Sequence, residues 1–246
     1  MAVFLCVSSG CGDDDRSTPR SDSGTDGRAD GTTTQATPGI VEITAAFENL
    51  QVVAYFDNPD AADQPNFRTL RDLACAPILR EGGPCVAVDC QAGTPPASAD
   101  VGAIEVSRGG TVLVSASNPG TGLYDATAGV TISTGETLEI SVDGRTVSVE
   151  MPEPLGVGVQ LGDAIGWAAP NGPVDRILAT LIADDDQAIC DLAGDVTSLT
   201  LDRTVLEDLA GRNPILSGYS VNVAESDGLT VRIHNFSFSS AADIPF

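Results

Sequence analysis

The stretch TLEISVDGRTVSVEM, residues 137–151, carries the clearest fold signal in this sequence. Apolar side chains stand at every second position of its two halves, which is the period of a β-strand with one buried face. Asp143 and Gly144 separate the halves, and an Asp-Gly pair is a preferred centre of a two-residue hairpin turn. The stretch therefore predicts a β-hairpin.

The same alternation recurs along the chain between Gly- and Pro-rich pieces. It predicts strands at residues 40–45, 51–57, 85–90, 101–107, 111–117, 128–133, 161–168, 175–183, 196–201, 215–223 and 228–238. One short helix is expected in TVLEDLAG, residues 204–211, where Thr204 and Glu207 have capping-box spacing and Gly211 ends the pattern. Other helical patterns are scarce, so the fold class is all-β.

The segment MPEPL, residues 151–155, has two prolines directly after a predicted strand, which is typical of a linker between domains. It divides the chain into residues 39–150 and residues 156–246. Short strands with Gly and Pro between them are typical of β-sandwiches. We therefore expect two β-sandwich domains, with the short helix in the second.

The second half resembles an immunoglobulin or fibronectin type III sandwich. The resemblance rests on Trp167 at the end of an early strand, on the strand at residues 177–183, and on YSVNV, residues 219–223. It implies that Trp167 lies in a core and that Tyr219, Val221 and Val223 face it.

The first residues, 1–11, resemble a truncated lipoprotein signal segment. Cys11, the residue that would be acylated, follows small residues, although Ser8 stands where such motifs usually have Leu. Residues 12–38 contain almost no apolar side chain and are expected to form a disordered acidic tether. The alternative is a frayed terminus with incidental cysteines, but the order of apolar leader, cysteine and polar coil favours a lipoprotein.

The whole chain also looks like uncharacterised Gram-negative lipoproteins with paired β-sandwich domains. This resemblance implies export and anchoring in a lipid bilayer through acylated Cys11, with the outer membrane as the expected location. The family has no known active residues that could be matched to this sequence.

Charge and composition exclude several classes of function. The formal net charge is −23, so nucleic acid is not an expected partner. All 12 basic residues are arginine, and without lysine the chain cannot form a P-loop, a Schiff base or an S-x-x-K nucleophile. No apolar run reaches 18 residues, so no transmembrane span is expected in the mature chain.

The single histidine, His234, excludes zinc motifs that need two. It lies in the strand at residues 228–238, where Leu229, Val231 and Ile233 define one face. Because His234 alternates with these apolar residues, we expect it to point to solvent. No G-x-S-x-G motif occurs, so a catalytic histidine is not expected.

Four cysteines lie beyond the N-terminal segment, and an even number in an exported chain predicts two disulfides. They are Cys75, Cys85, Cys90 and Cys190. Cys85 and Cys90 lie too far apart along one strand, at about 3.3 Å per residue, to bridge each other. The pairing is therefore either 75–85 with 90–190 or 75–90 with 85–190; one local disulfide with two free thiols is the alternative.

Acidic residues provide candidates for metal binding and for hydrolysis. Asp184, Asp185 and Asp186 could ligate calcium, but such a run is more often a solvated turn, and no cofactor is expected. Four glutamates could supply paired carboxylates for glycoside hydrolysis. They are Glu105, Glu136, Glu139 and Glu150.

These observations favour a non-catalytic envelope lipoprotein with a structural, adhesive or ligand-binding role. Its partner would be a protein or a glycan that the sequence does not identify. The alternatives are a secreted hydrolase that depends on carboxylates or calcium, and a carbohydrate-binding module.

Overall fold

A computed structural model describes residues 36–60, 67–75, 78–91, 93–118, 120, 122–156, 159–161, 164–209 and 214–241. The predicted signal segment 1–11 lies outside these residues, as does the predicted tether as far as residue 35. The fold begins at Gly39, next to the expected start at residue 40, and the Pro38 carbonyl accepts a hydrogen bond from Asp57 N. No helix among the described residues is long and apolar enough to cross a membrane.

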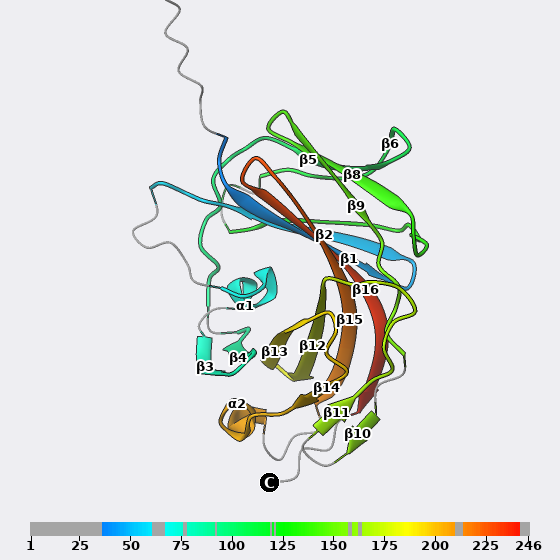
Figure 1. The fold of residues 1–246 in the computed structure, drawn as a ribbon. Coiled ribbons are helices and arrows are strands. Elements are labelled where there is room, and N and C mark those ends of the chain that lie inside the picture. The colour runs from blue at the N-terminus through cyan, green and yellow to red at the C-terminus, as the bar shows by residue number, and fades with distance from the viewer. Residues whose placement is uncertain are drawn as a thin grey trace, which may run out of the picture. The chain divides into compact units, whose positions relative to one another are not determined.

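The described part of the chain is all-β, as predicted, with its strands in three sheets (Figure 1). The nine-stranded sheet has the order β3 (Ile78–Gly82), β4 (Cys85–Asp89), β13 (Asp186–Ala193), β12 (Arg176–Ala183), β15 (Ile215–Ser226), β16 (Leu229–Ala241), β1 (Gly39–Ala46), β2 (Asn49–Phe56), β7 (Tyr124–Ala128). The four-stranded sheet has the order β6 (Thr111–Ala116), β5 (Ile104–Arg108), β8 (Thr137–Val142), β9 (Arg145–Glu150). The three-stranded sheet has the order β10 (Val159–Leu161), β11 (Ala164–Gly166), β14 (Ser198–Thr200).

The predicted hairpin is strands β8 and β9. Leu138 lies opposite Val149 and Ile140 opposite Val147, and all four side chains are buried. Asp143 and Gly144 have φ angles of 51° and 72°, as a type I′ turn requires. This confirms that alternation and turn chemistry together define this unit.

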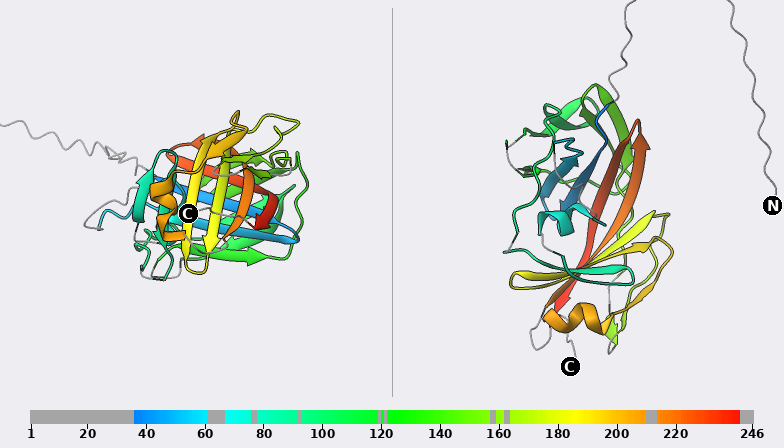
Figure 2. Two further views of the ribbon diagram at one scale, coloured as in Figure 1. Left: turned by 90° about the horizontal axis from the view of Figure 1, so that it is seen from below. Right: turned by 90° about the vertical axis from the view of Figure 1, so that its left-hand side faces the viewer.

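Strand β16 joins the two halves of the chain. It pairs in parallel with β1 on one edge and antiparallel with β15 on the other. Figure 2 shows β15 and β16 running past both the β1–β2 hairpin and the β12–β13 hairpin. A hydrogen-bonded sheet therefore runs through both predicted domains.

The register of the β15–β16 pairing shifts between Gly218 and Tyr219, and β16 contributes side chains to a different core on each side of this shift. Before it, Ile233 packs with strands β1 and β2 and with the four-stranded sheet. After it, Phe238 packs in a second core with β12, β13 and the three-stranded sheet. Gly218 makes room for this, because a Cβ there would lie 2.4 Å from Phe238 Cε1.

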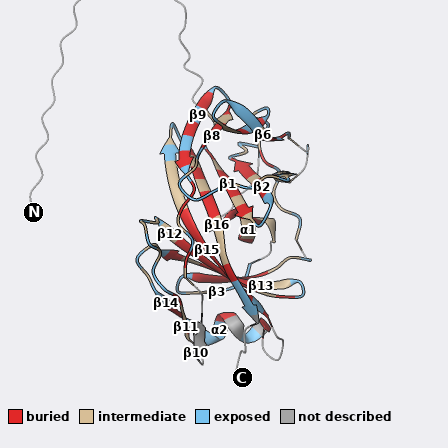
Figure 3. Ribbon diagram, turned by 90° about the vertical axis from the view of Figure 1, so that its right-hand side faces the viewer, coloured by how far each residue is buried: buried red, intermediate tan, exposed pale blue. Residues whose placement is uncertain are grey.

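The predicted sandwiches on either side of residues 151–155 are both present, since the four-stranded and the three-stranded sheet each pack on the nine-stranded sheet, but they share that sheet. Of the four apolar clusters among the described residues, the two largest are the sandwich cores; the first takes residues from β16 and the second takes Cys85 and Ala87 from β4. The alternating pattern revealed the strands and not their partners, because any strand with one apolar face can pair with any other. Figure 3 shows buried residues along β1, β15 and β16, where the two halves meet.

Several predicted strands have different bounds. Residues 128–133 are not a strand beyond Ala128, where β7 ends. Residues 161–168 contain the end of β10 and the separate strand β11, which pair antiparallel. Strands β3 and β13 were not predicted. On β13, Ile189 and its neighbours are buried on both faces of the sheet, as are Val86 and its neighbours on the adjacent strand β4. Strand β13 therefore shows no clean alternation of apolar and polar residues.

The helices also differ from expectation, since the described residues contain one in each half. Helix α2 (Arg203–Leu206), which continues as a 3₁₀ turn (Glu207–Leu209), is capped by Asp202 rather than Thr204. The Asp202 carboxylate accepts from Thr204 N at 2.9 Å. Helix α1 (Leu70–Ala74) was not predicted, because five residues are too short to show a helical period.

We predict that residues 36–151 will not fold alone, because β1 would lose its partner β16 and leave a row of buried backbone groups unpaired. Co-expression with residues 152–246 should restore a cooperative thermal transition, measured by circular dichroism of the co-purified pair. Cooperative unfolding of the isolated fragment 36–151 would contradict the shared sheet.

Candidate functional site

The candidate site lies on the face of the nine-stranded sheet that turns away from both cores, which we call the α1 face. Helix α1 contacts β2 and β4 on this face. Side chains of β1 and β16 that alternate with the core residues, including Glu42 and His234, point to it. Both of these side chains are buried.

Helix α1 is fixed at its N-terminus by a capping box. Thr69 N donates to Asp72 Oδ1 at 2.9 Å, and Asp72 N donates to Thr69 Oγ1 at 3.4 Å. Arg68 N also donates to Asp72. Burial of Asp72 raises the pKa of its carboxyl group despite these hydrogen bonds. A carboxylate at this position also interacts favourably with the positive end of the helix.

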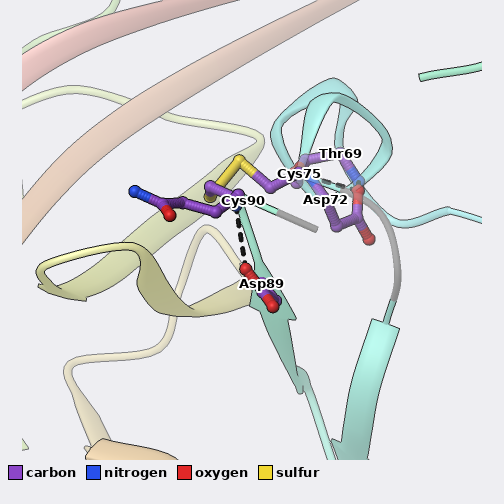
Figure 4. The surroundings of a disulfide bond; sticks show 6 residues. Thr69, Asp72, Cys75, Asp89 and Cys90 are labelled. Atoms are coloured by element: carbon purple, nitrogen blue, oxygen red, sulfur yellow. Dashed lines mark hydrogen bonds between the residues drawn. A yellow bond between two sulfur atoms is a disulfide. The ribbon is translucent and has the colours of Figure 1, made fainter. Parts of the chain in front are cut away.

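The other end of α1 is fixed by a disulfide between Cys75 and Cys90, which lies directly after β4 (Figure 4). The second disulfide joins Cys85 and Cys190, which lie opposite each other on β4 and β13. Of the two pairings that the sequence allowed, the structure therefore has 75–90 with 85–190. One disulfide fixes the helix to the sheet and the other reinforces the sheet itself.

A cavity of about 380 Å³ lies beside α1 on this face. Its wall is made of Glu42, Thr44, Gln51, Val53, Leu70, Arg71, Ala74, Cys75, Pro95, Gly122, Leu123, Asp125 and Gln187. Gln187 comes from β13 and Gln51 from β2, and four strands separate these two in the sheet. Because both side chains reach one cavity, the sheet curls around it.

A buried ion pair lies at this cavity. Arg232 Nη1 donates to Glu42 Oε1 at 3.3 Å, and also to the Arg68 carbonyl at 2.6 Å. Burial raises the pKa of Glu42 from 4.5 to about 6, although Arg232 and a hydrogen bond from Leu70 N oppose the shift. A buried charge pair of this kind is costly to break, because either partner alone would be left uncompensated.

His234 is 2% exposed, so the expectation that it points to solvent is wrong. Its side chain lies on the α1 face, where its ring centroid is 6.4 Å from the ring centroid of Tyr219. Burial, with the positive charges of Arg71 and Arg232, lowers the pKa of His234 from 6.5 to about 3. Nδ1 has no hydrogen-bond partner among the described residues, so His234 is a neutral packing residue here.

An aromatic row runs beside the cavity on the same face. Arg71 lies over the Tyr219 ring, 5.2 Å from its centroid, and Tyr219 contacts Phe236 edge to face at 5.6 Å. Phe236 in turn contacts Phe47 at 5.0 Å. Phe47 is 81% exposed and has a φ of 56°, a conformation that a bulky residue rarely adopts. Tyr219 and Val221 are buried in an apolar cluster, against which Val223 packs, so these side chains do face a core, although it is not the one that holds Trp167.

The other sequence candidates lie elsewhere. Asp184 and Asp185 form the turn between β12 and β13, and Asp186 begins β13. No three Asp, Glu, His or Cys side chains among the described residues are grouped so that they could hold a metal ion. Trp167 is buried in the second core, as the resemblance implied, and its indole N–H donates to the Val196 carbonyl at 2.9 Å.

The four candidate glutamates do not converge on a cavity. Glu105, Glu139 and Glu150 are exposed on the four-stranded sheet. Glu136 accepts hydrogen bonds from Ser133 N and Arg108, and these contacts lower the pKa of its carboxyl group. None of these four residues lines the cavity beside α1.

Comparison with known proteins gives no family for this chain. No protein-family model matches the sequence, and no curated protein matches it. A solved structure with similarity is the central fibronectin-III array of RIM-binding protein. It has 12% sequence identity and a TM-score of 0.28, and the match covers 80% of this chain and 76% of that one. We draw no functional conclusion from a similarity of this extent.

We predict that His234 makes the fold sensitive to acid. Its folded pKa is depressed, so its contribution to stability is present above pH 6.5 and is lost as the pH falls towards about 3. Glu42 acts in the opposite sense, because its folded pKa is raised: its contribution is present below pH 4.5 and is lost as the pH rises through about 6.

Replacement of His234 by Phe should therefore flatten the acid side of the stability profile. The slope of unfolding free energy against pH, from urea denaturation at pH 4 to 6, should fall by up to about 1.4 kcal/mol per pH unit. Glu42→Gln should steepen the same slope between pH 4.5 and 6. Identical slopes in wild type and His234→Phe would contradict the buried, neutral histidine.

Proposed function

We propose that this chain is an exported, non-catalytic protein, anchored to the cell envelope through acylated Cys11, that binds a small ligand in the cavity beside α1. The outer membrane is the proposed location. The proposal requires no cofactor, no nucleic acid and no membrane-spanning segment.

The observation that carries the binding role is the construction of the cavity. Its volume of about 380 Å³ is within the range of small-molecule sites, about 300–1,000 Å³. Apolar side chains such as Val53 and Leu123 share its wall with charged and amide side chains. The capping box and the Cys75–Cys90 disulfide fix the helix beside it, so the site is largely preformed.

The two disulfides support export. Disulfides of this kind persist in oxidising compartments and are rare in the cytosol. The Cys85–Cys190 bridge closes a sequence separation of 105 residues, so it restricts the unfolded chain strongly. Cys11 and the acidic tether lie outside the described residues, so the anchoring part of the proposal rests on their sequence alone.

The chemistry of the α1 face favours binding over catalysis. A general base works best with a pKa near the working pH, and the pKa of His234 is about 3. Nδ1 of His234 also has no hydrogen-bond partner among the described residues. Glu42 is occupied by Arg232 and by Leu70 N.

We predict that Cys11→Ala will release the protein from the membrane, because the acyl chains are attached only there. The measurement is detergent phase partitioning of the full chain after expression in a Gram-negative host. Cys6→Ala is the matched control, since it removes the neighbouring cysteine and should leave the protein in the detergent phase. Equal partitioning of the two variants, or a wild-type chain in the aqueous phase, would contradict the anchor.

A further inference from the structure

The charged side chains of the cavity wall indicate what kind of ligand it takes, if the cavity is the binding site proposed above. Among the described residues of the wall, three carry charge: Glu42, Arg71 and Asp125. Glu42 is already neutralised by Arg232. Arg71 and Asp125 have opposite charges, and neither forms an ion pair with a described residue.

Arg71 is held ready to receive an anion. Its guanidinium lies over the Tyr219 ring, 5.2 Å from the ring centroid. This cation–π contact uses the flat face of the guanidinium and does not use its N–H groups. No hydrogen bond joins these N–H groups to a described residue, although the positive charge of Arg71 acts on Glu42 and His234. A planar fork of free N–H donors matches a carboxylate, which it can bind through two parallel hydrogen bonds.

Asp125 supplies the opposite charge on strand β7. Its Oδ1 accepts from Gln51 Nε2 at 3.2 Å, an amide that is also part of the wall. No described residue donates to Oδ2, so the carboxylate can accept a further hydrogen bond from an ammonium group.

The rest of the wall fits a ligand whose middle is short and apolar. Val53, Leu70 and Leu123 contribute aliphatic surface, and Thr44 and Gln187 contribute polar groups. The volume of about 380 Å³ is at the small end of ligand sites. A ligand without net charge also avoids repulsion by a chain whose formal charge is −23.

We infer that the cavity binds a small zwitterion of the amino-acid or dipeptide type, with its carboxylate at Arg71 and its ammonium group at Asp125. This inference rests on the proposed binding function and adds the chemical class of the ligand.

The test measures binding of four matched probes to the purified full chain by isothermal titration calorimetry and by thermal shift. L-Leucine and glycyl-L-leucine carry both charges, N-acetyl-L-leucine lacks the ammonium group, and L-leucinamide lacks the carboxylate. At least one zwitterion should bind, and at least tenfold more tightly than either single-charge probe. A bound ligand stabilises the folded chain by mass action, so the melting temperature should rise with its concentration.

Two variants assign the ends of the ligand. Arg71→Gln should remove the preference for the zwitterion over L-leucinamide, and Asp125→Asn should remove the preference over N-acetyl-L-leucine. Arg108→Gln, at a partly buried position, and Asp195→Asn, at an exposed one, are matched controls outside the cavity, and both should bind as wild type does. Zwitterion binding that neither cavity variant weakens would overturn the inference.

A third variant separates failure of this inference from failure of the proposed function. Ala74→Trp places a large side chain at the cavity wall and should block any ligand there. If only a single-charge probe, acetate or glucose binds, and Ala74→Trp blocks it, the zwitterion is overturned and the binding function is supported. If Ala74→Trp blocks none of these six probes, because none binds in the cavity, both are overturned.

Discussion

The structure depends on the hydrogen bonds that strand β16 makes on both of its edges. On one edge it pairs in parallel with β1, which begins the fold, and on the other it pairs with β15. Parallel neighbours need a long connection, and here the connection is almost the entire chain. The first strand and the last strand must therefore meet before the first core is complete, because that core takes residues from both. This makes the two halves one hydrogen-bonded unit, although each half has its own apolar cluster.

The nine-stranded sheet that β16 holds together also forms one side of the cavity. The bulge at Gly218 re-aims the side chains of β16, and the curl of the sheet brings β13 and β2 to a common space. The α1 face is closed enough to bury Glu42 and His234, and open enough for Arg71 and Asp125 to line the cavity. The disulfide at Cys75 holds α1 beside this space, since a five-residue helix has little stability of its own.

Much of the fold could be predicted from local pattern, and the site could not. The β8–β9 hairpin followed from alternation and Asp143-Gly144, and the buried Trp167 was implied by the resemblance to an immunoglobulin or fibronectin type III sandwich. The prediction that His234 points to solvent was wrong. Alternation shows which side chains share a face of a strand, but it does not show whether the opposite face is covered by other residues. What covers it includes Arg71 and Tyr219, residues 163 and 15 positions away in sequence. Arg71 and Asp125 belong to no recognisable sequence motif, so the sequence did not single them out. They line one cavity because the sheet is curled.

The central claim is that β16 holds both cores in a single cooperative unit. Native-state hydrogen exchange of the full chain, followed amide by amide, tests it most directly. The amides of β1, β12, β15 and β16 should open together, with one common free energy close to that of global unfolding. If the β1 and β12 amides instead open with clearly different free energies, and β16 divides at its bulge, the halves are separate domains and the account is contradicted.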